Sequence, residues 1–145
     1  MVRRYIYVTM MARELIHQDE FARIYWDAKL GMVELDARGD PTSAQYRTIM
    51  DRLLQIVKEK NASKLLGDCG NVGAVSFEDL LWTETDWSTR LAKTKMKYVA
   101  IIMPKSLGLH MAIDKMSDKV DGKTVGQVRK FFADTDSARK WLVSQ

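Results

Sequence analysis

KLLGDCGNVGAVSFEDLLWTETDWSTRLAK, residues 64–93, decides how the rest of the chain folds. It begins with a short buried strand around Leu65 and Leu66, continues through a glycine-rich loop over residues 67–73, and then enters a helix at Ser76. A strand that runs through such a loop into a helix N-terminus is where open α/β sheets usually bind their ligands. We therefore predict an α/β fold and expect any site to lie in this stretch.

The composition of the whole chain is that of an ordinary globular protein. Its 145 residues suffice for one domain with a sizeable core, and 46% of them are hydrophobic. The sequence has no run of about 18 apolar residues, so we expect no membrane insertion. One cysteine excludes an internal disulfide, and together with two histidines it gives no metal-site spacing. We expect a cytoplasmic protein without a metal or cofactor.

The charge is distributed unevenly along the sequence. The net charge is +4, yet acidic residues outnumber basic ones up to Ser88, and the reverse holds from Thr89 onward. The excess lysines and arginines are scattered singly, and no stripe of them alternates with aromatic residues. We therefore expect no nucleic-acid partner. We interpret these residues as solvated surface charges, with an anionic ligand or surface as the alternative.

The segments before the central stretch predict a hairpin and a helix. Residues 21–27 and 32–38 alternate apolar and polar side chains around a short glycine-containing turn, which is typical of an antiparallel hairpin. Thr42 followed by Gln45 has the capping-box pattern, and an apolar helical stripe follows as far as the expected stop at Asn61. Residues 1–20 fit neither pattern clearly, so we treat them as an extension of a single domain that spans residues 1–145.

The segments after the central stretch alternate between strands and helices. Residues 98–103 are almost continuously apolar, as in strands of parallel sheets that are buried on both faces. A short helix after Ser106, a turn at residues 118–122, a strand over residues 125–132 and a C-terminal helix capped by Asp134 or Asp136 follow. This order predicts a mixed, largely parallel sheet of about five strands, with an N-terminal antiparallel hairpin and helices on its faces.

The helix that begins at Ser76 contains an anomaly. At about 100° per residue, one face carries Phe77, Leu80, Leu81, Glu84, Trp87, Ser88 and Leu91, whereas Trp82 falls on the opposite, polar side. A large aromatic side chain on a polar face is expected to pack against another group. That group could be another segment of the fold, a second subunit or a ligand.

The pattern resembles the SpoIIAA-like proteins, a family of small bacterial STAS/SEC14-like domains. The resemblance covers most of the chain, and it depends on packing and capping motifs rather than on catalytic signatures. These motifs are NASKLLGD (61–68), VSFED (75–79), DWSTR (86–90), YVAII (98–102) and FFAD (131–134). The resemblance implies a sheet of about five strands covered by helices, and a role as a regulatory or protein-interaction module.

The resemblance also suggests where a phosphorylation switch would lie in this sequence. In regulatory STAS domains, a Ser or Thr follows an Asp near the start of the helix after a central strand. Here Asp68 is followed by Cys69, Gly70 and Asn71, and Ser76 comes later as a helix cap. The missing hydroxyl argues against a switch of that kind.

Seven residues are candidates for binding a ligand or partner, and none is assigned a catalytic or metal-binding role: Asp68, Cys69, Gly70, Asn71, Ser76, Trp82 and His110. The amides of the predicted loop could hold an anion, or its glycines could simply permit a tight turn. Asp68 could instead cap the loop through its own backbone. Cys69 could be a nucleophile only with a positioned base, and otherwise it is a half-buried thiol. His110 either contacts a ligand or faces water.

Three functions are therefore open. The first is a non-enzymatic regulatory or interaction module, a homodimer with Trp82 near the subunit contact and with a regulatory protein as a further partner. The second is a carrier of a small apolar or lipid-like ligand, held between the sheet and the helices around residues 76–92 and 106–117. The third is an enzyme that uses Asp68 and Cys69, which requires His110 within hydrogen-bond reach of the thiol.

Overall fold

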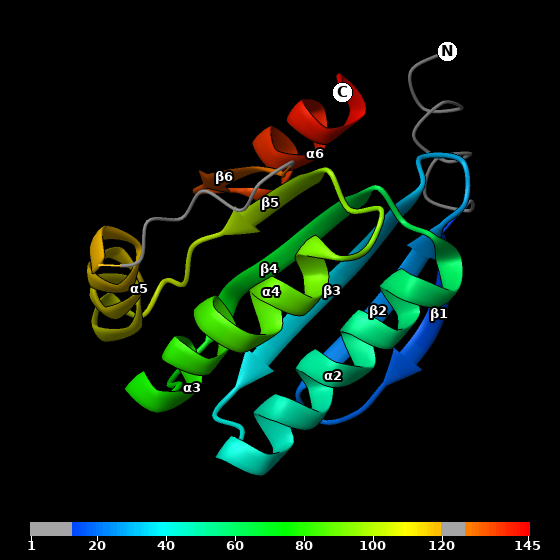
Figure 1. Cartoon of the computed structure of the whole chain (residues 1–145). Coiled ribbons are helices and arrows are strands. Elements are labelled where there is room, and N and C mark those ends of the chain that lie inside the picture. Colours follow the sequence, from blue (N-terminus) through cyan, green and yellow to red (C-terminus); the bar gives the residue numbers. More distant parts are fainter. Residues whose placement is uncertain (1–12, 120–126) are drawn as a thin grey trace.

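The computed structural model of the chain describes residues 13–119 and 127–145 as a six-stranded sheet with helices on both faces (Figure 1). The elements follow the predicted alternation of strands and helices. They are β1 (Arg13–Gln18), β2 (Ala22–Asp27), β3 (Met32–Gly39), α2 (Ser43–Lys60), β4 (Lys64–Val72), α3 (Phe77–Trp82), η1 (Thr83–Trp87), α4 (Ser88–Ala92), β5 (Tyr98–Ile102), α5 (Leu107–Lys119), β6 (Val128–Phe132) and α6 (Thr135–Val143).

The strands lie in the sheet in their sequence order, from β1 to β6. The pairs β1–β2 and β2–β3 are antiparallel, and the pairs from β3 to β6 are parallel. The predicted hairpin is confirmed as β2 and β3, in which Ala22 pairs with Ala37 and Asp27 with Met32. The additional strand β1 comes from the N-terminal extension, of which residues 1–12 lie outside the described residues.

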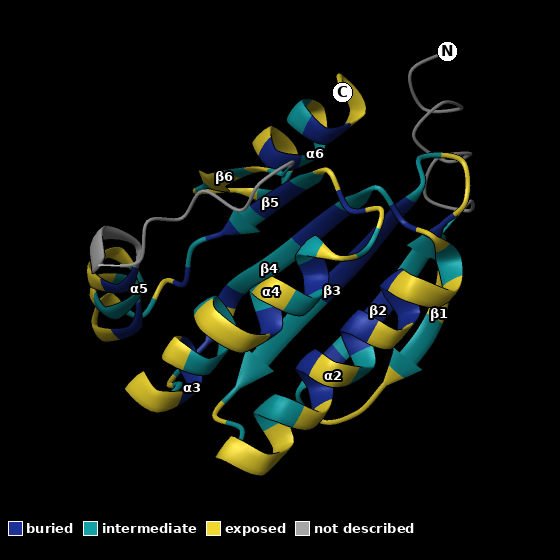
Figure 2. Cartoon of the chain, in the orientation of Figure 1, coloured by how far each residue is buried: buried dark blue, intermediate teal, exposed yellow. Residues whose placement is uncertain are grey.

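Each face of the sheet has its own core, because side chains alternate between the two faces of a strand. On one face, Leu65 and Val99 belong to a cluster with residues of α2 and of the segment from α3 to α4. On the other face, Leu66 and Ala100 pack with residues of α6. A third cluster joins α5 to α3 and to the end of β4. Figure 2 shows the buried residues along the strands and on the inner sides of these helices.

The predicted helix boundaries are confirmed where side chains cap the backbone. Thr42 and Gln45 form the reciprocal capping box of α2, and Asn61 ends that helix with φ 51°. Asp134 caps α6 by accepting a hydrogen bond from the Ser137 amide. The predicted turn at residues 118–122 is wrong at its start, because α5 continues to Lys119, and its remainder lies outside the described residues.

The glycine-rich loop predicted at residues 67–73 is wrong, because β4 continues through it to Val72. Gly67 pairs with Leu35 on one side and with Ile101 on the other. Backbone hydrogen bonds to β3 as far as Val72, and to β5 as far as Asp68, outweigh the weak strand preference of Gly, Asp and Asn. A register shift between β3 and β4 accommodates the extra residue near Gly70. The loop that remains is short, and it leads directly to Ser76.

Candidate ligand-binding cavity

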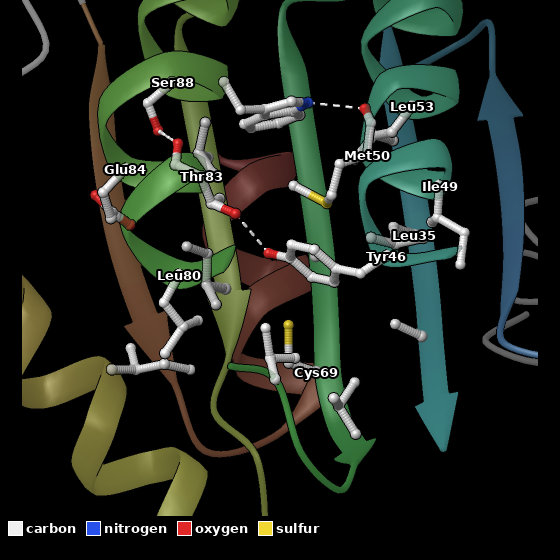
Figure 3. A pocket seen from close by; sticks show the side chains of 18 of the residues that line it. Leu35, Tyr46, Ile49, Met50, Leu53, Cys69, Leu80, Thr83, Glu84 and Ser88 are labelled. Atoms are coloured by element: carbon white, nitrogen blue, oxygen red, sulfur yellow. Dashed lines mark hydrogen bonds between the residues drawn. The ribbon is translucent and has the colours of Figure 1, made fainter. Parts of the chain in front are cut away.

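An apolar cavity of about 170 Å³ lies between the sheet and its helices (Figure 3). Side chains of β3, β4, β5 and β6 form its floor, and side chains of α2, of the segment from α3 to α4 and of α5 form its walls. Most of the lining is aliphatic or aromatic. The cavity lies where the carrier hypothesis expects a pocket, between the sheet and the helices around residues 76–92 and 106–117.

Gly67 leaves the floor of the cavity open. A Cβ atom built on it would have one nonlocal neighbour within 4 Å, the main-chain oxygen of Ala100 at 3.9 Å. Because Gly67 lines the cavity, a larger side chain there would extend into the empty space. Glycine weakens a strand interior, and it often marks a place where a ligand approaches the backbone. Gly67, which was predicted from the sequence to lie in a loop, therefore shapes the cavity.

The helical wall contains a π-helical turn, η1. The amide of Ser88 donates to the carbonyl of Thr83, and the Ser88 hydroxyl donates to the same oxygen at 2.8 Å. The wider turn presents Thr83, Glu84, Trp87 and Ser88 to the cavity. Figure 3 shows the side chains of Thr83, Glu84 and Ser88 along this wall. Such turns within helices are frequent at functional sites.

The predicted helix face is therefore correct only in part. Leu80, Glu84, Trp87, Ser88 and Leu91 line the cavity as the helical period predicts. Phe77 and Leu81 are exposed instead. The change from α-helical to π-helical geometry at Thr83 alters the angle between successive residues, so a single period cannot describe the whole segment.

The polar groups in the walls bind one another. The Thr83 hydroxyl donates to Asp79 O at 2.8 Å, so Tyr46 is the donor to Thr83 Oγ1 at 2.6 Å. Burial raises the pKa of Tyr46 well above its ordinary value and keeps the phenol protonated. Trp87 Nε1 donates to Met50 O at 2.7 Å. These bonds join α2 to the opposite wall and hold the cavity open between them.

Cys69 is the one sequence candidate that lines the cavity. Burial, and to a smaller extent the charge of Asp68, raise the pKa of its thiol to about 12. At neutral pH the thiol is therefore protonated and a poor nucleophile. This result argues against the enzyme hypothesis, which needs an activated Cys69.

We expect iodoacetamide at pH 8 to alkylate Cys69 more than about 100-fold more slowly in the native protein than in the unfolded chain, because only the thiolate reacts. Mass spectrometry of samples quenched over time measures both rates. The same protein in 6 M guanidinium chloride, where the thiol regains its ordinary pKa, is the control. Equal native and unfolded rates would show that the thiol is neither buried nor deactivated.

Trp82 is covered by its own chain. Its ring meets the Tyr46 ring edge-on at 6.4 Å between centroids. The guanidinium carbons of Arg47 and Arg90 lie 4.9 Å and 5.6 Å from the Trp82 centroid. Another segment of the fold thus provides contacts for the aromatic residue on the polar face, which is the first of the three alternatives.

The remaining candidates lie apart from the cavity. Asp68 accepts a hydrogen bond from the Gly70 amide at 2.9 Å, so it caps its own backbone. Asn71 is exposed on β4. Ser76 accepts a hydrogen bond from the Asp79 amide and caps α3. His110 Nδ1 lies 3.2 Å from a carboxylate oxygen of Asp114 on the same helix. The structure does not gather the candidates into one site.

Sequence reasoning missed several residues of the cavity, among them Gly67, Gln127 and Arg129. One feature of the sequence indicated that a charged residue of this kind would be present. Glu84 falls on the predicted apolar face of its helix, where a charged residue needs a partner. That partner is Arg129 of β6.

Within residues 13–119 and 127–145, no group of three His, Cys, Asp or Glu residues is arranged to hold a metal ion. In the same part of the chain, no helix has the length and apolar character needed to cross a membrane.

The fold defines the protein as a small α/β domain with a mixed sheet between two helical layers. The chain belongs to the SpoIIAA-like family, because the model of that family matches residues 32–143, more than half of its length. The match confirms the resemblance found in the motifs. No curated protein matches the chain.

A solved structure with the same fold is an uncharacterised protein of the DUF3478 family from Shewanella loihica, which is described as SpoIIAA-like. It is 18% identical to this chain, with a TM-score of 0.52, and the match covers 90% of this chain and 92% of that one. At this identity the similarity shows the fold alone.

Proposed function

We propose that this protein is a non-enzymatic binding module that holds a small apolar ligand between its sheet and its helices. The observation that carries the proposal is the apolar cavity of about 170 Å³ above Gly67. An engineered apolar cavity of about 150 Å³ in another protein binds benzene. A single ring or a short branched chain is therefore the expected size of the ligand.

The energetics support the same conclusion. An enclosed empty cavity destabilises a protein by about 24 cal/mol per Å³, so an unfilled apolar space of this size costs at most about 4 kcal/mol relative to a filled core. Marginally stable domains rarely leave so large a gap without use. A bound apolar ligand would recover much of this free energy.

The state of the candidate catalytic groups supports a non-enzymatic role. The Cys69 thiol has a raised pKa, and Asp68 accepts a hydrogen bond from its own backbone. His110 pairs with Asp114 on α5. No hydrogen bond among the described residues joins the Cys69 thiol to a base, which nucleophilic catalysis needs.

Native mass spectrometry of protein purified from its own host tests the proposal. We expect an added mass that survives mild ionisation and leaves when the protein is denatured, and its value will give the ligand class. If the mass equals that of the bare chain, and small apolar compounds added in excess also fail to bind, the proposal is wrong.

A second function, the regulatory or interaction module, is supported by the outer face of α5. Leu107 and Met111 are 72% and 51% exposed, and they lie one helical turn apart. Adjacent exposed apolar residues are typical of protein contacts. We propose a second copy of this chain as the occupant, and the same spectra report it as a dimer mass. A strict monomer at high concentration would exclude the homodimer.

A further inference from the structure

We infer that the ligand of this cavity carries a carboxylate and that Arg129 binds it in exchange for Glu84. The inference deepens the proposed function and needs it to hold, because the carboxylate is the head group of the apolar ligand. It depends on three charged or polar residues that line the cavity next to β6: Glu84, Gln127 and Arg129.

Glu84 and Arg129 form an ion pair that connects the helical wall to the edge strand. Arg129 Nη1 donates to the two carboxylate oxygens of Glu84 at 3.0 Å and 2.9 Å. The two side chains are only 17% and 18% exposed. Figure 3 shows Glu84 on the side of η1 next to β6. A guanidinium at the edge of an apolar cavity thus already binds a carboxylate.

Gln127 provides a donor that has no acceptor. Its Nε2 atom is buried and makes no hydrogen bond. Gln127 directly precedes β6, two residues before Arg129, and both residues line the cavity. Buried donors almost always have a partner, and an unmatched one indicates a missing acceptor.

The balance of groups favours an anion. Among the described residues that line the cavity, the charged ones are Arg38, Glu84 and Arg129, so cations outnumber anions. The Nε atom of Arg38 is also buried without a partner. A cationic head group would be repelled here, and a neutral one would leave the donors weakly matched.

A carboxylate fits this site better than other acceptors. The planar guanidinium matches a carboxylate through two parallel hydrogen bonds, which are stronger than neutral ones. In the exchange, a ligand carboxylate would take the place of that of Glu84, retain the bonds to Arg129 and could also accept from Gln127, while the displaced Glu84 carboxylate, already 17% exposed, would turn toward water. Glu84 therefore competes with the ligand and sets its affinity.

Calorimetric titration with two matched probes tests the inference. The probes are 3-phenylpropanoate and 3-phenylpropan-1-ol, which share a ring and a chain and differ in the head group. We expect the wild-type protein at pH 7.5 to bind the acid at least about ten-fold more tightly than the alcohol, because charge-assisted hydrogen bonds are the stronger ones.

Two single variants give opposite results if the exchange takes place. We expect Glu84→Gln to strengthen binding of the acid, and Arg129→Gln to weaken it by at least about ten-fold. In both variants the affinity for the alcohol should change less than the affinity for the acid, because its neutral head group forms only the weaker hydrogen bonds. A purely structural ion pair would instead weaken both probes in both variants.

The remaining outcomes separate the two proposals. If acid and alcohol bind equally well in all three proteins, the head-group inference is wrong and the cavity proposal stands. If neither probe binds, the head-group inference fails, and the cavity proposal fails as well if the native mass equals that of the bare chain. The double variant Glu84→Gln, Arg129→Gln keeps a neutral hydrogen-bonding pair. It replaces Arg129→Gln if that variant does not fold, and it must also lose the preference for the acid.

Discussion

The substitution Gly67→Val is expected to stabilise the ligand-free protein and to abolish ligand binding. We expect the free energy of unfolding to rise by about 3 kcal/mol, since each of the three added carbons contributes about 0.8 kcal/mol when buried and glycine in a strand costs about 0.5–1 kcal/mol. The valine side chain would extend into the space above β4, where a Cβ atom has one nonlocal neighbour within 4 Å. The same atoms would occupy the ligand's volume and lower its affinity by at least about 100-fold.

Urea denaturation and calorimetry with 3-phenylpropanoate measure the two effects of this substitution. Gly108→Ala is the matched control, because Gly108 is exposed on α5 and its added Cβ would meet no atom within 4 Å. It should stabilise the helix by about 0.5–1 kcal/mol and leave binding unchanged. If Gly67→Val binds the ligand like the wild type, the ligand lies elsewhere. If the variant is destabilised, the space above Gly67 is not available to a side chain.

The second large effect is expected at Asp79. We expect Asp79→Ala to lower the free energy of unfolding by about 3 kcal/mol, because it breaks a buried charged network. Asp79 is only 3% exposed, and it accepts hydrogen bonds from Ser43 Oγ and Arg47 Nε, each at 2.8 Å. These bonds fix α2 to the start of α3. Asp79 therefore helps to position both helical walls of the cavity.

The same network predicts a pH dependence. Burial alone would raise the pKa of Asp79, but hydrogen bonds from Arg47 and Ser43 outweigh it and hold the pKa below the ordinary value of 3.8. A lowered pKa in the folded state stabilises the protein fully above the ordinary value. This stabilisation is lost as the pH falls below 3.8 and through the folded pKa.

The stability difference between the wild type and Asp79→Asn should therefore be constant from pH 7 to about pH 5 and should shrink below about pH 4. Urea midpoints at pH 7, 5, 4 and 3 measure it. Asp51→Asn is the control, because Asp51 forms an exposed ion pair with Arg90 and should change stability by less than about 1 kcal/mol. A difference that stays constant down to pH 3 would contradict the lowered pKa.

Most of the fold could be predicted from local signals. The alternation in β2 and β3, the capping box at Thr42 and the apolar run of β5 each have a short-range cause, and each prediction is confirmed. The length of β4 could not be predicted in this way. Its glycines and polar residues resemble a loop, and only pairing with β3, and with β5 as far as Asp68, makes them extended.

The candidate cavity was harder to predict than the fold, because a void is a property of three-dimensional packing. The sequence indicated the correct helices. It also singled out Cys69, but as a candidate nucleophile and not as a residue that lines the cavity. The π-helical turn that presents Thr83 depends on hydrogen bonds that no residue pattern indicates. The unmatched donor of Gln127 becomes visible only when its surroundings are known.

The central claim is that a ligand occupies the space above Gly67. Methyl-resolved nuclear magnetic resonance of the full chain, titrated with whichever of the two probes binds more tightly, tests it most directly. We expect intermolecular contacts between probe protons and the methyl groups of the lining residues Leu65, Val99 and Ile101. Contacts confined to the exposed methyl groups of Leu107 and Met111 would place the probe outside the cavity and contradict the claim.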